Sequence, residues 1–187
     1  MYAAQFNKLY EQLVVNPLCE SGFERRGRQV YFEFGESILA LLRFERKFSA
    51  FVQETYVSMC LRHRFLRSTQ DDCVPDARTD RTIDYPFKFR PSTFNRRALK
   101  KWKYRGYYAE SRAHNWDLLE YGAVRSPLAV HKILETITAN ALVCGRALAE
   151  QITPERAQIE LLKRGDNVWC EKRWNEDYQL QSRSARQ

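Results

Sequence analysis

The sequence predicts an α+β fold: an antiparallel sheet with an N-terminal helix and two C-terminal helices packed on one face. Three observations predict it: a helical period at both ends of the chain, a strand period between them, and short connections between the strands. With 187 residues, 44% of them hydrophobic, the chain can bury one sizeable core. We therefore expect a single domain over residues 1–181, followed by a disordered tail over residues 182–187.

The first element is an amphipathic helix. Its apolar side chains recur at intervals of three and four residues, which places them on one face: Tyr2, Phe6, Leu9, Tyr10, Leu13 and Val14. We expect this helix to end at Asn16, because Pro17 disfavours the helical conformation of the residue before it.

The middle of the chain changes to a period of two, the pattern of half-buried strands. Three such runs, 30–34, 38–45 and 51–62, are separated by short connections. Only antiparallel neighbours can be joined in this way, since a parallel crossover needs about a dozen residues. Residues 68–86 then form a long polar loop rich in Asp, of the kind that is either functional or mobile.

Helical signals return in the last third of the chain. Ser126 and Pro127 are typical of an N-cap and a first helical residue, and an apolar stripe follows them. Thr153-Pro154 repeats this start signal, and we expect the second helix to end at Gly165.

The net charge of +8 comes from one segment. Residues 1–86 carry 12 basic and 12 acidic side chains and residues 113–187 carry 10 of each, whereas residues 87–112, the basic segment, carry nine basic and one acidic. Seven rings lie among these cations: Phe87, Phe89, Phe94, Trp102, Tyr104, Tyr107 and Tyr108. Interleaved cations and rings can hold an anionic partner by long-range attraction and ring contacts.

The basic segment is expected to contain strands around 87–90 and 104–111, with a helical turn over 96–102 as the alternative for its centre. The candidate partner-binding residues occupy that centre: Arg96, Arg97, Lys100, Lys101, Trp102, Lys103, Tyr104 and Arg105. Two other interpretations stay open. The segment could be a solvated hairpin whose rings point inward, or the acidic loop 68–86 could fold back and neutralise it.

The sequence carries no H-E-x-x-H, no paired C-x-x-C, no Walker loop and no G-x-G-x-x-G. The nearest set of metal ligands is Cys60, His63 and Cys73. Strand alternation places the first two on opposite faces, and no fourth ligand is evident. We therefore expect neither a metal nor a cofactor.

Residues suited to nucleophilic or acid–base chemistry are scattered. Cys144 lies on the apolar stripe of a helix and is expected in the core. His63 and His114 are expected at the surface, where either could serve as a general acid. Glu33 and Glu45 could shift each other's pKa if they faced one another, but nearby arginines favour ion pairing. We expect that the protein is not an enzyme; a hydrolase with an unfamiliar site is the least favoured interpretation.

One motif carries a family resemblance. The run Gly22-Phe23-Glu24-Arg25-Arg26-Gly27-Arg28, followed by Val30-Tyr31-Phe32, resembles the opening of an uncharacterised bacterial family, the domain of unknown function numbered four-three-zero-four. The stretch 38–61 and Trp116-Asp117 follow in the same order, and the resemblance is clearest over the first third of the chain. Similar proteins resemble immunity proteins associated with polymorphic toxins. Those directed against nucleases are often acidic, whereas this chain has a pI of about 9.4.

The resemblance implies a non-catalytic immunity (antitoxin) protein that binds and neutralises a cognate bacterial toxin domain, as in contact-dependent growth inhibition, and here a toxin with an acidic face. The alternative is a nucleic-acid-binding module that uses residues 87–112. No small-molecule substrate is expected. Five cysteines without a pairing pattern, no secretory signal and no apolar stretch of about 18 residues predict a cytoplasmic protein that does not enter a membrane.

Overall fold

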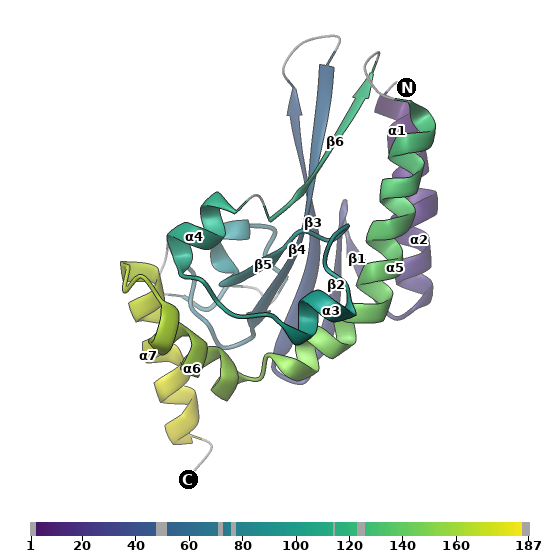
Figure 1. Ribbon diagram of the computed structural model, residues 1–187. Coiled ribbons are helices and arrows are strands. Elements are labelled where there is room, and N and C mark those ends of the chain that lie inside the picture. Colours follow the sequence, from purple (N-terminus) through teal and green to yellow (C-terminus); the bar gives the residue numbers. More distant parts are fainter. Residues whose placement is uncertain are drawn as a thin grey trace.

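The structure, a computed structural model, describes residues 3–47, 52–70, 73–75, 78–113, 115–122 and 126–184. Its α+β architecture confirms the predicted class, because helices from both ends of the chain pack against an antiparallel sheet (Figure 1). Within the described ranges, no helix has the length and apolar character needed to cross a membrane.

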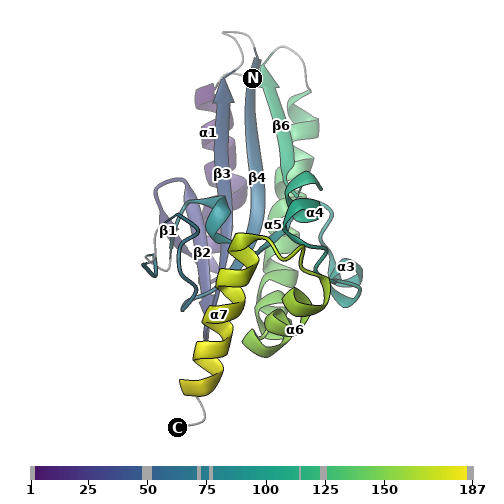
Figure 2. The ribbon, with the colours of Figure 1, turned by 90° about the vertical axis from the view of Figure 1, so that its left-hand side faces the viewer.

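Six strands are described, and all of their pairings are antiparallel. They are β1 (Glu24–Arg26), β2 (Gln29–Phe34), β3 (Ser37–Lys47), β4 (Val52–His63), β5 (Phe87–Phe89) and β6 (Asp117–Gly122). The predicted meander is confirmed, since β2, β3 and β4 are neighbours in chain order. Two short strands share the outer edge of β4. Strand β5 pairs with residues 59–61, and β6, which lies beside β4 in Figure 2, pairs with residues 52–57.

The N-terminal helix is longer than predicted. It runs as α1 (Ala3–Tyr10), a π-helical turn η1 (Glu11–Val15) and α2 (Asn16–Glu20), so the expectation that it ends at Asn16 is wrong. The π-helical turn explains the difference, because the N–H of Asn16 donates to the carbonyl of Glu11, five residues earlier. The wider turn lets the helix continue past Pro17, which would clash with the preceding turn of a regular α-helix.

Pro17 also leaves one carbonyl without its usual donor. In an α-helix the Leu13 carbonyl would accept from the N–H of residue 17, and proline has none. The hydroxyl of Thr138, in the long C-terminal helix, donates to that carbonyl instead at 2.6 Å. A side chain from the long C-terminal helix therefore supplies a hydrogen bond to the first helix beside its proline.

Three helices end the described chain: α5 (Pro127–Gln151), α6 (Pro154–Arg164) and α7 (Trp169–Ser184). The starts predicted at Pro127 and Pro154 are confirmed, and the Thr153 hydroxyl caps α6 by accepting from the N–H of Arg156 at 3.3 Å. Helix α7 continues to Ser184, so residues 182–184 are helical although they were expected to belong to a disordered tail. Residues 185–187 lie outside the described ranges.

One large apolar core lies between the sheet and the helices. Helices α1, α2 and α5 cover one face of the sheet (Figure 1). Alternate residues of the strands point into this core: Val30, Leu39, Leu41, Val57, Met59 and Leu61. Leu134 of α5, Leu161 of α6 and Trp174 of α7 belong to the same cluster, so all three C-terminal helices contribute to it.

The opposite face carries a smaller apolar cluster that includes Tyr31, Ile38, Leu42 and Tyr85. The long loop predicted before β5 covers it and contains a 3₁₀ turn, η2 (Thr82–Asp84). Asp84 is fully buried and orders the loop, because its carboxylate accepts hydrogen bonds from three residues of that loop: Ser68, Thr69 and Thr79.

The basic segment is only partly a pair of strands. Strand β5 is confirmed, and the centre forms the alternative helical turn, α3 (Arg96–Lys100). The second strand, expected around 104–111, is wrong: the chain forms α4 (Tyr107–Arg112) there. Gly106 adopts a φ of 95° before the helix, and acceptors from the C-terminal part of the chain hold its first turn. Strand β6 was not predicted.

Candidate functional site

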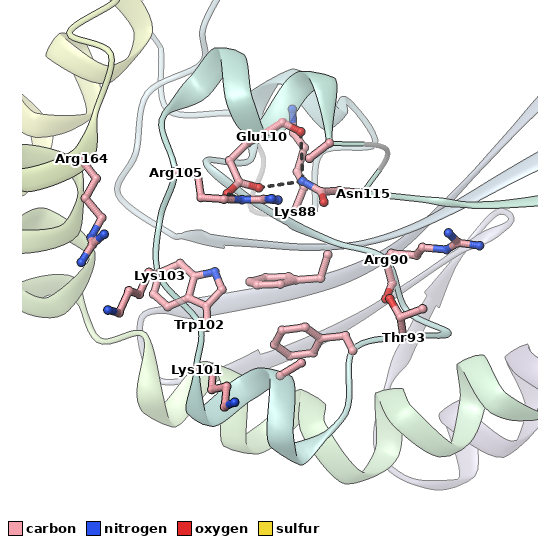
Figure 3. Close-up of a pocket in the computed structure, with 14 residues that line it drawn as sticks. Lys88, Arg90, Thr93, Lys101, Trp102, Lys103, Arg105, Glu110, Asn115 and Arg164 are labelled. Atoms are coloured by element: carbon pink, nitrogen blue, oxygen red, sulfur yellow. Dashed lines mark hydrogen bonds and ion pairs between the residues drawn. The ribbon is translucent and has the colours of Figure 1, made fainter.

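A cleft of about 590 Å³ lies beside β5, between α3, α4 and the end of α6 (Figure 3). Six basic side chains line it: Lys88, Arg90, Lys101, Lys103, Arg105 and Arg164. One carboxylate, that of Glu110, faces them. The apolar part of the lining includes three rings, those of Phe89, Phe94 and Trp102. The cleft is thus a strongly basic hollow with a partly aromatic wall.

Local backbone geometry explains how the cations reach the cleft. Strand alternation in β5 sends Phe87 and Phe89 into the main core and Lys88 to the other face. Helix α3 begins at the N-cap Asn95, whose side-chain oxygen accepts from the N–H groups of Arg97 and Ala98 at 3.0 and 3.1 Å. The chain leaves α3 directly along the cleft with residues 101–105.

Buried or partly buried carboxylates hold the arginines of the cleft. Asp117, 2% exposed, accepts from Nε of Arg90 at 2.8 Å and from both the N–H and the hydroxyl of Ser92. Nε of Arg105 lies 3.3 Å from Oε1 of Glu110. Arg164 pairs with Glu160 at 3.0 Å, one turn earlier in α6. These ion pairs orient the guanidinium groups and neutralise part of their charge.

The lysines of the cleft are not neutralised in this way. Lys101 and Lys103 are exposed, and neither forms an ion pair with any carboxylate of the described ranges. Lys88 is partly buried, with its ammonium 5.8 Å from the centre of the Tyr107 ring. Burial lowers the pKa of Lys88. The excess positive charge of the cleft therefore resides mainly on its lysines.

The structure separates the eight predicted partner-binding residues into three groups. Lys101, Trp102, Lys103 and Arg105 line the cleft. Arg96, Arg97 and Lys100 are exposed on α3 but lie outside the lining. Tyr104 is a correction, since it is 1% exposed and its hydroxyl donates to Glu171 at 2.6 Å. Its ring belongs to the core and is not available to a partner.

Most rings of the basic segment point into the protein, as the interpretation of a solvated segment with inward-pointing rings predicts. Phe87, Phe89, Phe94 and Tyr104 are all less than 9% exposed. Trp102 is partly exposed, but the edge of Phe87 packs against it at 5.4 Å and the Arg156 guanidinium lies 5.7 Å from its centre. Most of the rings that could have stacked on a ligand are therefore part of the fold.

Several lining residues were not predicted. Lys88 and Arg90 lie in the basic segment, and its charge excess was the signal that could have included them. Arg164 comes from α6, about sixty positions further along the chain, and no local pattern marks it. Asn115 donates from Nδ2 to the carbonyl of Glu110 at 3.0 Å and to its carboxylate at 2.7 Å (Figure 3).

The acidic loop does not neutralise the cleft through its described residues. Asp84, its buried carboxylate, is engaged within the loop itself and with Arg81. The carboxylates that pair with the cleft arginines come from β6, α4 and α6. Asp71, Asp72 and Asp76 of the loop lie outside the described ranges.

A second hollow of about 400 Å³ shares a wall with the cleft. Lys88, Glu110 and Asn115 line both, and the far wall of the second hollow is aromatic: Phe44, Tyr56 and Trp116. The Tyr56 and Trp116 rings meet edge to face at 6.1 Å. Lys88 therefore lies between a basic and an aromatic compartment.

His63 is buried, which overturns the expectation that it lies at the surface. Its Nδ1 is 2.7 Å from the hydroxyl of Tyr178, and its Nε2 is 3.0 Å from the carbonyl of Ile152. Burial lowers the pKa of His63 to about 4. Both ring nitrogens are engaged in holding the end of β4 to the C-terminal helices. His114 lies outside the described residues.

The other candidate groups have structural surroundings. Cys144 is in the core, as predicted. Cys60 and His63 lie on opposite faces of β4, also as predicted. Glu45 pairs with Arg43 at 2.6 Å, and Glu33 pairs with Arg64 at 2.6 Å, which confirms ordinary ion pairing. Among the residues that the structure describes, no three His, Cys, Asp or Glu side chains are grouped to hold a metal ion.

Comparisons with protein-family models, with curated proteins and with solved structures found no match. The resemblance to the bacterial family described above stays an expectation, and the function is inferred from the cleft.

Proposed function

We propose that the protein is a non-catalytic binding protein that neutralises a cognate toxin domain in the cytoplasm by covering an acidic face of that domain with the basic cleft. The observation that carries the proposal is the concentration of cations around one open hollow, six basic side chains against one carboxylate. Such a field attracts an acidic surface over several ångströms and fixes its orientation as it docks. The kind of partner comes from the family resemblance.

The organisation of the cations supports this function. Arg90 and Arg105 are held by carboxylates that are 2% and 6% exposed, so their positions are set before a partner arrives. Lys101 and Lys103 are exposed at the rim and free to adapt. The cleft thus presents pre-oriented guanidinium groups beside adaptable ammonium groups, and both kinds are exposed to a partner.

The buried rings favour a protein partner over a nucleic acid. Single-stranded nucleic acids are held by bases stacked on exposed aromatic faces. Here Phe87, Phe89 and Phe94 are buried, and Trp102 already contacts Phe87 and Arg156. The cleft would therefore bind a ligand mainly through its positive charge, and an acidic protein face carries the complementary charge.

The first test is capture of the partner. The protein is co-expressed with the product of the neighbouring gene, and complex formation and protection of the cells are measured. The double variant Lys101→Glu/Lys103→Glu is expected to lose at least about 100-fold in affinity and to lose protection, because like charges brought together cost several kcal/mol.

The matched control is Lys8→Glu/Lys132→Glu. It makes the same change in net charge at exposed positions of α1 and α5, outside the cleft. We expect it to bind and protect like the wild type. Equal losses in both variants would show that only the net charge matters and would contradict a docking role for the cleft.

The second test separates the nucleic-acid alternative. RNA and DNA oligonucleotides are titrated at two salt concentrations, since binding through phosphates weakens steeply as salt is added. We expect no measurable affinity at low salt. Tight, salt-sensitive binding that the cleft double variant abolishes would overturn the proposal in favour of a nucleic-acid-binding module.

A further inference from the structure

Lys88 is partly buried, and it differs from the fully buried charged groups of the molecule because each of those forms at least one hydrogen bond. Arg43 donates to Asn7 and Glu45, Asp117 accepts from Arg90, and Arg62 donates to the carbonyl of Leu66. Within the described parts of the chain, the ammonium of Lys88 has neither a hydrogen bond nor an ion pair. It lies 5.8 Å from the centre of the Tyr107 ring and interacts with the charge of Glu110 only at longer range. Lys88 is therefore a partly buried cation with no hydrogen-bonded or ion-paired partner in the described chain.

The nearest carboxylate in the lining is already engaged. Oε1 of Glu110 lies 3.3 Å from Nε of Arg105, and Oε2 accepts from Nδ2 of Asn115 at 2.7 Å. These contacts hold Glu110 on the wall that it shares with Lys88 (Figure 3). Glu110 tempers the positive field at that wall without forming an ion pair with Lys88.

A desolvated cation without a partner costs folding free energy. Burial lowers the pKa of Lys88, which reports the same cost. An anionic group that reached Lys88 through the cleft would form the ion pair that the free protein lacks. This ion pair would offset the desolvation of the ammonium, so the position favours binding of an anion. The cleft provides the path, because Lys88 lines it together with the rim cations Lys101 and Lys103.

We infer that Lys88 anchors an anion subsite at the inner wall of the cleft, and that this subsite takes one carboxylate, an Asp or Glu side chain of the partner protein. The inference rests on the proposed function. A carboxylate fits better than a phosphate because there is one ammonium to match, and Glu110 on the same wall repels a second negative charge. The rim lysines then meet the acidic residues around the inserted side chain.

The test compares the same substitution at two depths of the cleft. Lys88→Met and Lys103→Met each replace an ammonium by a thioether of similar length, and affinity for the partner is measured by calorimetry. We expect Lys88→Met to weaken binding about 30-fold or more and Lys103→Met less than about 5-fold, because a desolvated charge contributes more than one at the rim. Equal losses would overturn the inference.

The stability of the free protein provides the second readout. An anchor kept for binding is unfavourable in the unbound state, so Lys88→Met is expected to keep or raise the Tm while it weakens binding. A lowered Tm with unchanged affinity would show that Lys88 has a structural role and would overturn the inference. Lys132→Met, at an exposed position of α5, controls for loss of one positive charge.

A third measurement does not depend on the partner. A hexaglutamate peptide and inorganic phosphate are titrated against protein labelled at its lysine side chains, and the NMR signal absent from Lys88→Met is followed. We expect the peptide to shift that signal at lower concentration than phosphate does. If no partner is captured but the peptide acts at Lys88, the proposed function fails and the subsite stands. An unmoved Lys88 signal, or a stronger response to phosphate, overturns the subsite.

Discussion

The helix-covered face of the sheet and the basic cleft at the edge of the sheet are held together differently. The first consists of regularly spaced apolar residues such as Leu39, Met59 and Leu134, all at most 1% exposed. The second consists of short elements and the loops between them, and its shape depends on carboxylates that bind backbone and arginine groups, such as Asp117 and Glu171. The comparison teaches that the cleft's shape and its excess charge are separable, because different residues provide them.

The largest effect is expected in the apolar region. Leu134→Ala removes a fully buried side chain of α5 and leaves a cavity against the sheet. We expect a loss of about 2–5 kcal/mol in the free energy of unfolding, measured by urea titration. Leu134 does not line the basic cleft, so a variant that still folds should bind the partner with the affinity of the wild type. A loss below about 1 kcal/mol would contradict the assignment of Leu134 to the core.

The contact between the end of β4 and the C-terminal helices is expected to respond to pH. Folded His63 has a pKa of about 4, against about 6.5 when unfolded, so between these values the unfolded chain binds the extra proton. The stability held by neutral His63 is fully present above about pH 6.5 and is lost as the pH falls toward 4, by about 3 kcal/mol in total.

Urea titrations at pH 7 and pH 4.5 of the wild type and of His63→Gln measure this effect. Glutamine can keep both hydrogen bonds, to Tyr178 and to the Ile152 carbonyl, but does not titrate. We expect the wild type to lose more stability than the variant over this interval. Parallel losses in the two proteins would show that His63 is not the group responsible.

The cleft is expected to depend on its buried acceptors. Asp117→Ala removes the acceptor of Arg90 and of the Ser92 backbone, and we expect a loss of about 2 kcal/mol in the free energy of unfolding. Partner affinity should fall as well, since Arg90 is no longer held. Unchanged stability, in contrast, would show that the cleft is not organised by this carboxylate.

The smallest effect is expected at the rim. Lys101→Ala/Lys103→Ala changes exposed side chains without carboxylate partners in the described chain, so the free energy of unfolding should change by less than about 0.5 kcal/mol. Thermal unfolding of the wild type and the variant, followed by circular dichroism, measures this change in stability. A larger loss would mean that the two lysines also stabilise the fold. The shape of the cleft and its excess charge would then depend on the same residues.

The sequence predicted secondary structure best where burial of one face repeats at a regular spacing along the chain. The alternation over residues 30–62 and the apolar stripe after Pro127 each reflect burial of one face, and both elements are confirmed. The run 104–111 was misread as a strand because partners distant in sequence decide its conformation. Glu171 accepts the N–H of Tyr107, and Asp166 accepts that of Tyr108, at 2.8 Å each.

The candidate site was predictable in its charge but not in its geometry. The nine cations of the basic segment identified the region, yet a composition pattern cannot indicate that Tyr104 turns inward to Glu171. Nor can it indicate that Arg164 enters from α6. His63 was expected at the surface because its sequence neighbours are charged. It is buried because Tyr178 and Ile152, from the last third of the chain, contact it.

The contact between Thr138 and the Leu13 carbonyl has a consequence for the order in which the chain acquires its structure. Synthesis delivers the first helix early, but the donor that compensates for Pro17 emerges 125 residues later. Until then the Leu13 carbonyl lacks this donor, and the hydrogen bond forms only when α5 arrives. The earliest segment made is thereby among the last to be completed.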